Sequence, residues 1–183
     1  VRVDTVGEII SRVLDVGAAG VQIPQITTRA EAEAAIAYAK FYPQGERGVC
    51  RYVRAANYSS MDKFSYFQEA NENLVILQLE GQKALQNMEE ILSVPGIDII
   101  FIGPYDLSQS LGLTGQVTHP QVEEKMREII AACKQQGIAV GTFSDTIENA
   151  RKWREAGVQY LSYAADVGIF YEACVAKYQE LTR

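Results

Sequence analysis

The feature of this sequence that most constrains its fold is a series of short apolar runs that recur between helical segments. The clearest run, Leu74 to Leu79, shows no alternation of apolar and polar residues over its first four positions. Strands that are buried on both faces have this composition, because neither face meets water. The regular alternation of such strands with helices predicts a parallel sheet built from consecutive βα units.

The whole chain can be divided into elements of these two kinds. Strands are expected at Val21–Ile23, Leu74–Leu79, Ile97–Ile102, Ile138–Phe143 and Tyr160–Ala164, with a possible strand remnant at Val1–Val3. Helices are expected from Asp4-Thr5 to Gly17, from a Thr27-Thr28 cap to Ala39, from a Ser59-Ser60 cap to Ala70, from Gln82 to Leu92, from His119-Pro120 to Gly137, from Thr146 to Ala156 and from Ile169 to Leu181. Such a series is compatible with a doubly wound open sheet or with a (β/α)8 barrel.

Composition narrows the class of protein and its partners. A length of 183 residues with 48% hydrophobic residues suits one domain, residues 1–183, with one sizeable core. The net charge of -6 argues against nucleic-acid binding, which needs clustered Lys and Arg. No run approaches the roughly 20 apolar residues of a membrane span, and the first residues lack the layout of a signal peptide. The 3 cysteines have neither disulfide-framework nor metal-site spacing, which favours a cytoplasmic setting.

Charged residues at the ends of expected strands are the candidates for chemistry, because active sites of parallel α/β folds lie at the carboxyl ends of the strands. Glu80 ends LVILQLE, Asp106 follows IIFIGPY, Asp166 follows YLSYAA, and Arg2 lies in the amino-terminal remnant. Two carboxylates on successive strands can converge on a hard cation such as Mg²⁺ or Mn²⁺. The alternatives are that Glu80 interacts with the start of the next helix and that Asp106 caps a short helix beginning at Leu107.

Three other residues each allow two interpretations. Gln78 lies on the same side of its strand as Glu80, and its amide could hold a substrate oxygen or satisfy a backbone group of the core. Gly103 could let a ligand approach the backbone or could simply form a turn. His119 is the single histidine and so a candidate general base, but its place before Pro120 at a helix start favours a capping role.

The segment Gln44–Ser60 is polar, basic and long for a loop. Its arginines and an exposed aromatic could bind an anionic ligand, line a subunit contact or form solvated surface. These residues are Arg47, Arg51, Tyr52 and Arg54. Three aromatic residues elsewhere have spacings typical of the core: Trp153, Tyr160 and Tyr163.

Two motifs on consecutive expected strands, VILQLEG and PGIDIIFIGPYDLSQSLGL, carry a family resemblance, together with LDVGAAGVQIPQI and YPQGERGV upstream. The chain resembles the class II, metal-dependent pyruvate aldolases typified by 2,4-dihydroxyhept-2-ene-1,7-dioate (4-hydroxy-2-oxoheptanedioate) aldolase, in order and over essentially its whole length. The resemblance implies a TIM-type (β/α)8 barrel and a divalent metal ion (Mg²⁺, Mn²⁺ or Co²⁺). It also implies a homo-oligomer, a hexamer that is a trimer of dimers, in which the last helix packs across to a neighbouring subunit.

The resemblance further implies roles for individual residues. Glu80 and Asp106 match the two metal-binding carboxylates, and Asp106 also lies beside the substrate. Gln78 matches a glutamine that contacts the substrate. Tyr105, with Gly103 close by, occupies the position whose backbone binds the pyruvate carboxylate, and its side chain is larger than that of many relatives.

Two more residues match catalytic positions. Arg2 matches an arginine that binds the carbonyl oxygen and stabilises the enolate, and Asp15 matches an aspartate that raises the basicity of an active-site histidine. That histidine has no counterpart in this sequence. Since a barrel of this type usually has about 250 residues, the chain is expected to lack roughly the first two βα units.

The implied reaction is the reversible cleavage of a 4-hydroxy-2-oxo acid to pyruvate and an aldehyde. One alternative is an acyl-CoA lyase of the citrate or malyl type, for which the segment from Arg47 to Arg54 is the candidate adenine-binding region. The other is a non-catalytic, truncated paralogue. We expect the 183 residues alone to show no aldol cleavage, because the base is absent from them.

Overall fold

The centre of the molecule is one curled sheet of five parallel strands. It is seen in a computed structural model that describes residues 1–4 and 6–182. The strands are β1 (Gly20–Ile23), β2 (Leu74–Leu79), β3 (Ile99–Ile102), β4 (Ala139–Ser144) and β5 (Tyr160–Tyr163). All five expected strands are therefore confirmed, with β3 beginning two residues later than predicted.

Strand order decides between the two candidate architectures. The order in the sheet is β1-β2-β3-β4-β5, so strands that follow one another in the chain are also neighbours in space. A doubly wound sheet reverses its order at a switch point, whereas a barrel keeps it. The five strands thus form part of a barrel, and Arg2 adds an isolated parallel bridge to Gln22 beyond β1.

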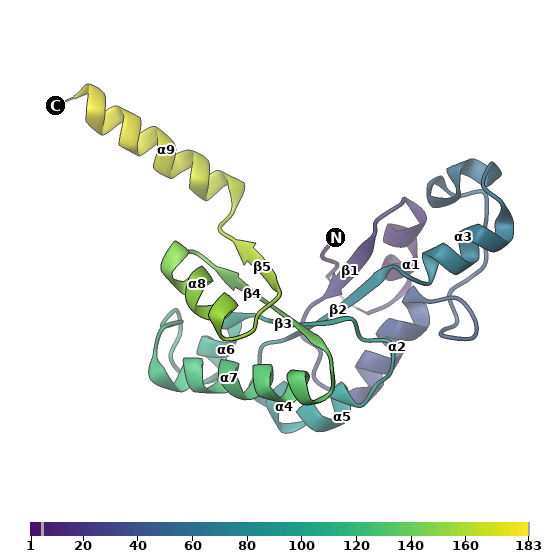
Figure 1. Cartoon of the computed structure of the whole chain (residues 1–183), viewed down its shortest axis with the longest axis horizontal. Helices are drawn as coiled ribbons and strands as arrows, with labels where there is room; N and C mark the ends of the chain where they lie inside the picture. The colour runs from purple at the N-terminus through teal and green to yellow at the C-terminus, as the bar shows by residue number, and fades with distance from the viewer. Residues whose placement is uncertain (5, 183) are drawn as a thin grey trace.

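The helices pack mainly on the convex side of this sheet (Figure 1). They are α1 (Glu8–Asp15), α2 (Arg29–Ala39), the 3-10 segment η1 (Arg54–Ser59), α3 (Lys63–Ala70), α4 (Gln82–Gln86), α5 (Met88–Leu92), α6 (Pro104–Ser110), α7 (Pro120–Gln135), α8 (Ile147–Glu155) and α9 (Asp166–Leu181). The main core lies between sheet and helices, where Leu77, Ile100 and Met126 are completely buried.

Several helix starts follow from the capping residues in the sequence. Thr28 forms a capping box with Glu31, and the Thr146 hydroxyl accepts a hydrogen bond from the backbone of Asn149. The Nδ1 atom of His119 accepts one from the Gln121 backbone at 3.3 Å, so His119 caps α7. The capping interpretation of the single histidine is therefore confirmed.

Three of the expected helix boundaries are wrong or untested. Asp62, and not Ser59-Ser60, caps α3, because its carboxylate accepts from the backbones of Phe64 and Ser65. The helix expected from Gln82 to Leu92 is two helices that break at Asn87, whose amide donates to the Thr27 carbonyl at 2.8 Å. The first helix was expected to open at Asp4-Thr5; Thr5 lies outside the described residues, and α1 begins at Glu8.

The last strand, β5, and the last helix, α9, are more exposed to solvent than expected. Trp153 is buried, but Tyr160 is 38% and Tyr163 40% exposed, so the prediction that both tyrosines lie in the core is wrong. The reason is that β5 is the edge strand of an open sheet. Helix α9 begins at Asp166, three residues before the expected start, and projects away from the rest of the molecule without a buried residue (Figure 1).

Candidate active site

The concave face of the sheet collects polar side chains near the carboxyl ends of β2 and β3. Gln78 and Glu80 share this face because side chains alternate along a strand. Gly103 directly follows the neighbouring strand β3, and a Cβ atom there would be 2.3 Å from Glu80 Oε2 and 3.0 Å from Gln78 Nε2. Position 103 therefore requires glycine for a steric reason, since any larger side chain there would displace the Glu80 carboxylate.

Glu80 is buried, with only 5% of its surface exposed. Its Oε1 atom accepts a hydrogen bond from the Gln25 backbone at 3.0 Å, and its Oε2 atom accepts one from the Gln78 side chain. Gln78 in turn accepts from the Gln22 side chain at 2.8 Å, which fixes the direction of the relay from β1 to β2. Both of the donors to Glu80 lie outside α4, so the hydrogen bonds that it accepts here do not come from the start of the next helix.

Asp106 lies close to Glu80 and belongs to the first turn of α6. That helix begins at Pro104 with Gly103 as its N-cap, so the expected short helix starting at Leu107 with an Asp106 cap is wrong. Burial raises the pKa of Glu80; hydrogen bonds from Gln78 and Gln25 oppose this, and the charge of Asp106 adds to it. The structure therefore brings the two predicted carboxylates together as a like-charge pair in a partly desolvated place.

The backbone of Gln25 supports this pair at a conformational cost. Gln25 has φ 54°, in the left-handed region, and this places its N–H against Glu80. Such a conformation costs a residue with a side chain roughly 1 kcal/mol or more. Sequence reasoning missed Gln25, because its contribution is a backbone hydrogen bond that no side-chain pattern announces.

Arg2 lies at the same end of the sheet, on the far side of Gln22. Its backbone pairs with Gln22, whose side chain contacts Gln78, and its own side chain is exposed. Strand β1 therefore lies between the backbone of Arg2 and β2, the nearer of the two strands that lead to the carboxylate pair.

Tyr105 forms a second polar contact at the carboxyl ends, on the side of β4. Its hydroxyl donates to the Asp145 carboxylate, and its ring lies 6.2 Å from the ring of Phe143. This hydrogen bond, then burial and the negative charge of Asp145, raise the pKa of Tyr105. Asp145 was not selected as a candidate from the sequence, although it directly follows β4 just as Glu80 follows β2.

With this geometry established, comparison with known proteins identifies the family. The family model described as HpcH/HpaI aldolase/citrate lyase matches residues 1–173. The chain belongs to this aldolase/citrate lyase family.

Individual relatives agree with the family assignment. A hydroxypyruvate/pyruvate aldolase from Paraburkholderia phytofirmans is 39% identical over 165 residues, which cover 87% of this chain and 62% of the relative. A 5-keto-4-deoxy-D-glucarate aldolase from Citrobacter koseri is 35% identical over 166 residues, covering 90% and 64%. The chain thus spans about three fifths of the length of these curated relatives.

A solved structure gives the same result for the fold. A protein of the family from Burkholderia cenocepacia superposes with a TM-score of 0.92 and 36% identity, over 100% of this chain and 72% of that one. The five-stranded sheet therefore corresponds to part of the TIM-type barrel of the HpcH/HpaI aldolases, as the motifs predicted.

One residue that the resemblance assigned to catalysis does not reach this site. Asp15 ends α1, before β1 starts, and its carboxylate pairs with Arg47 at 2.5 Å. Glu80 follows the other end of β2, a distance of roughly 20 Å for six residues at about 3.3 Å each. Within the described residues, Asp15 is therefore paired with Arg47 and is not brought together with Glu80 and Asp106. The role that the resemblance gives it, beside a histidine that this sequence lacks, stays a prediction.

The basic segment also lies at the amino-terminal end of the sheet. The Arg47 side chain is completely buried against Asp15 and the Phe41 ring, and Arg51 donates to the Ser59 carbonyl at 2.6 Å. Arg54 and Tyr52 remain exposed. Two of the three arginines are thus used inside the protein, which weakens the case for an adenine-binding loop.

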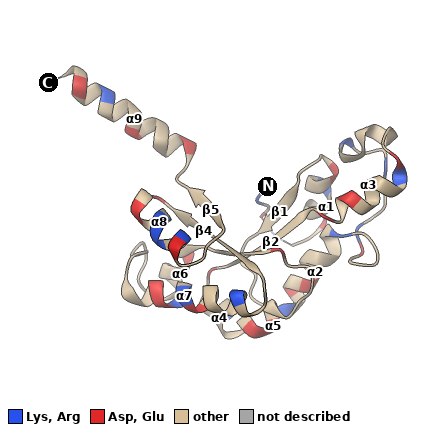
Figure 2. Cartoon of the chain, viewed as in Figure 1, with Lys and Arg blue, Asp and Glu red and all other residues tan. Residues whose placement is uncertain are grey.

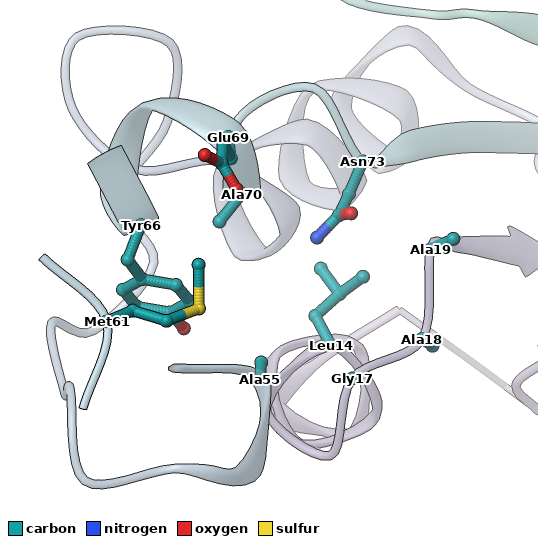
Figure 3. A pocket seen from close by; sticks show the side chains of 10 residues that line it. All are labelled: Leu14, Gly17, Ala18, Ala19, Ala55, Met61, Tyr66, Glu69, Ala70 and Asn73. Carbon is teal, nitrogen blue, oxygen red and sulfur yellow. The ribbon is translucent and has the colours of Figure 1, made fainter. Parts of the chain in front are cut away.

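A pocket of about 270 Å³ opens at this same end, between α1, η1 and α3 (Figure 3). Leu14, Ala55, Met61 and Tyr66 contribute much of its lining, and Glu69 is the one carboxylate among the described residues that line it. The pocket therefore lacks the convergent titratable groups of an active site, and the carboxylate pair on the concave face is the better candidate.

Proposed function

We propose that this chain provides the carboxylate-bearing part of a metal-dependent aldolase, which reversibly cleaves a 4-hydroxy-2-oxo acid to pyruvate and an aldehyde. The observation that carries the proposal is the pairing of buried Glu80 with Asp106 at the carboxyl ends of β2 and β3. The names of the two aldolases with 39% and 35% identity support the same class of reaction.

The residues at this place fit a divalent cation. Two neighbouring carboxylates repel each other when both are charged, and a bound cation would offset this repulsion. Because Gly103 has no side chain, it leaves room beside Glu80 Oε2, where a Cβ atom would lie 2.3 Å from that oxygen. Glu80 and Asp106 are the residues that would hold an ion such as Mg²⁺ or Mn²⁺, and no third His, Cys, Asp or Glu joins them within the described part of the chain.

When bound, such an ion would supply positive charge that stabilises the enolate of pyruvate. The protein's own residues would orient the substrate around it. Gln78, held by Gln22, presents its amide beside Glu80. The first turn of α6 leaves the backbone N–H groups of Tyr105 and Asp106 without helical acceptors, and these suit the pyruvate carboxylate. The proposal gives Arg2 the role of a positive charge near the carbonyl oxygen.

We assign the proton-transfer group of the reaction to none of these residues. His119 is engaged in capping α7, and Asp15 lies at the opposite end of the sheet. We therefore propose that the 183 residues bind the metal but do not catalyse aldol cleavage alone. A form extended at its amino terminus to the length of these relatives is the form in which activity is expected.

Metal binding is the direct test of the proposal. We expect calorimetry to show one Mn²⁺ site on the wild-type chain and none on Glu80→Gln or Asp106→Asn, because each change removes a charged ligand while keeping the side-chain shape. Glu90→Gln is the matched control, since Glu90 is an exposed glutamate on α5.

Unchanged Mn²⁺ affinity in both site variants would contradict the metal assignment. Robust cleavage of 4-hydroxy-2-oxo acids by the 183 residues alone would contradict the assignment of the base to another segment. Absence of cleavage by the extended form, with Mn²⁺ bound, would favour the non-catalytic alternative.

We also propose that the protein assembles as a homo-oligomer through α9, in the hexameric arrangement that the resemblance implies. The support is the apolar surface of this helix, where Phe170 is 70%, Tyr171 69% and Leu181 86% exposed. Figure 2 shows that most of α9 is uncharged. Such a surface is rarely left in water. Light scattering should give a multiple of the 20.3 kDa chain mass that falls on Phe170→Glu.

A cytoplasmic location completes the proposal. Cys50, Cys133 and Cys174 are all free thiols, which is the usual state in a reducing compartment.

A further inference from the structure

The contact between Tyr105 and Asp145 lies at the rim of the concave face, beside the proposed active site. Tyr105 directly precedes Asp106 in α6, and Asp145 directly follows β4. Phe143 faces the concave side two residues after Gly141, at which a Cβ atom would be 2.9 Å from the ring of Phe101. The Tyr105 ring therefore lies beside Phe143 at the carboxyl end of β4, and Tyr105 is the neighbour in sequence of Asp106, one of the two paired carboxylates.

The Tyr105 ring is held in place from behind. Its hydroxyl is bound to Asp145, and its ring lies against Phe143. The crevice behind it, towards Asn149 and Trp153, has a volume of about 10 Å³. That is room for no more than a single water molecule. A bound substrate would therefore contact this pair from its solvent-exposed side.

The pair presents acceptors and negative charge to that side. The single proton of the Tyr105 hydroxyl is donated to Asp145, which leaves the lone pairs of the phenol oxygen and the carboxylate to face a ligand. Tyr105 is 44% exposed, and Asp145 is also exposed. In both residues the atoms that a ligand would meet can accept a hydrogen bond, and Asp145 repels an anion.

We propose that Tyr105 and Asp145 select the aldehyde partner of the reaction, favouring neutral aldehydes that carry a hydroxyl group over aldehydes that carry a carboxylate. This inference rests on the proposed aldolase function and names its acceptor class. The hydroxyl of such an aldehyde donates to the phenol oxygen or to Asp145, whereas a carboxylate has no proton to donate and meets a like charge.

Three aldehydes of similar size separate these effects. Glycolaldehyde is neutral and hydroxylated, propanal is neutral without a hydroxyl group, and glyoxylate carries a carboxylate. Each is condensed with pyruvate by the amino-terminally extended form with Mn²⁺, and ratios of kcat/KM are compared within one variant, so that a general loss of activity cancels. Exchange of the pyruvate methyl protons in D₂O, followed by NMR, reports the enolisation half of the reaction without any aldehyde.

We expect wild type to prefer glycolaldehyde to both other aldehydes. Asp145→Asn, which removes the charge but keeps the shape, should narrow the ratio of glycolaldehyde to glyoxylate by about fivefold to tenfold, the effect of one nearby unit charge at a protein surface. Added salt should narrow the same ratio in wild type and leave it unchanged in Asp145→Asn. Tyr105→Phe should reduce the preference for glycolaldehyde over propanal. Glu148→Gln, which changes an exposed carboxylate at the start of α8, three residues after Asp145, is the matched control and should change neither ratio.

The outcomes distinguish this inference from the function on which it rests. A wild-type protein that exchanges pyruvate protons but uses glyoxylate as well as glycolaldehyde overturns the acceptor assignment alone. An equal ratio of kcat/KM for glycolaldehyde over glyoxylate in wild type and in Asp145→Asn also overturns the acceptor assignment alone. A wild-type protein that exchanges no pyruvate protons with Mn²⁺ bound overturns the proposed aldolase and the inference with it.

Discussion

The two ends of the curled sheet place charged side chains in opposite ways. At the amino-terminal end, Arg47 is paired with Asp15, and Lys40 donates to the carbonyls of Asn71 and Asn73 at 2.7 and 2.6 Å. Lys40 also lies 3.9 Å from Asp98. At the carboxyl end, Glu80 and Asp106 repel each other, and Gln25 is strained.

The charged pairs at the amino-terminal end therefore stabilise the fold, whereas the like-charge pair at the carboxyl end is suited to binding a cation. Removing one partner of an opposite-charge pair leaves an uncompensated buried group and is destabilising. Removing one member of a like-charge pair relieves repulsion, so stability is expected to rise while function is lost. The sign of a stability change can therefore tell the two ends apart.

The largest expected effect is at the buried arginine. Arg47→Met should lower the free energy of unfolding by about 3 kcal/mol, because the partly buried Asp15 loses its counter-charge and the completely buried Arg47 side chain loses its contact with the Phe41 ring. The measurement is urea denaturation followed by circular dichroism. Arg54→Met, an exposed arginine of the neighbouring η1, is the control and should stay within about 0.5 kcal/mol of wild type. A loss at Arg54 as large as that at Arg47 would contradict the assignment.

A smaller loss is expected at the buried lysine. Lys40 is only 4% exposed, and Lys40→Met would leave the carbonyls of Asn71 and Asn73 without their donor. The expected cost is roughly 2 kcal/mol, typical of buried acceptors left unsatisfied. The same denaturation assay applies, with exposed Lys83→Met as the matched control. A stability equal to that of wild type would show that water reaches these carbonyls.

The smallest effect should have the opposite sign. Glu80→Gln should stabilise the metal-free chain by about 1 kcal/mol at neutral pH, as the removal of a functional like-charge pair often does. Because the pKa of Glu80 is raised in the folded state, its proton stabilises the fold at pH values below the unfolded pKa, and this contribution is lost as the pH rises through the folded value.

The advantage of Glu80→Gln over wild type should therefore grow as the pH increases above about 4.5, where the unfolded carboxyl ionises, and then level off. Thermal denaturation across this range measures it, and Glu90→Gln should show no such growth. Adding Mn²⁺ should reverse the order of wild type and variant, because a ligand that binds the native state alone stabilises it by mass action. If the stability difference between Glu80→Gln and wild type is the same at all pH values, the raised pKa of Glu80 is contradicted.

Much of the fold could be predicted because its signals are local. The apolar runs located all five strands, and Thr28 and Thr146 marked helix starts, since a strand's burial and a helix's cap depend on neighbouring residues. The errors arose where tertiary contacts decided. Asn87 interrupts the expected helix because its side chain reaches Thr27, and Tyr160 and Tyr163 are exposed because β5 lies at the edge of the sheet.

The sequence by itself determined the residue types of the site and their order along the chain. Glu80, Asp106, Gln78 and Gly103 could be selected because parallel strands bring their carboxyl ends to one edge. Only the tertiary structure decided which of them meet. It joined Gln25 and Asp145 to the site through a backbone N–H and a strand end, and it placed Asp15 at the other end of the sheet, because distance between strand ends is a property of the folded sheet and not of spacing along the chain.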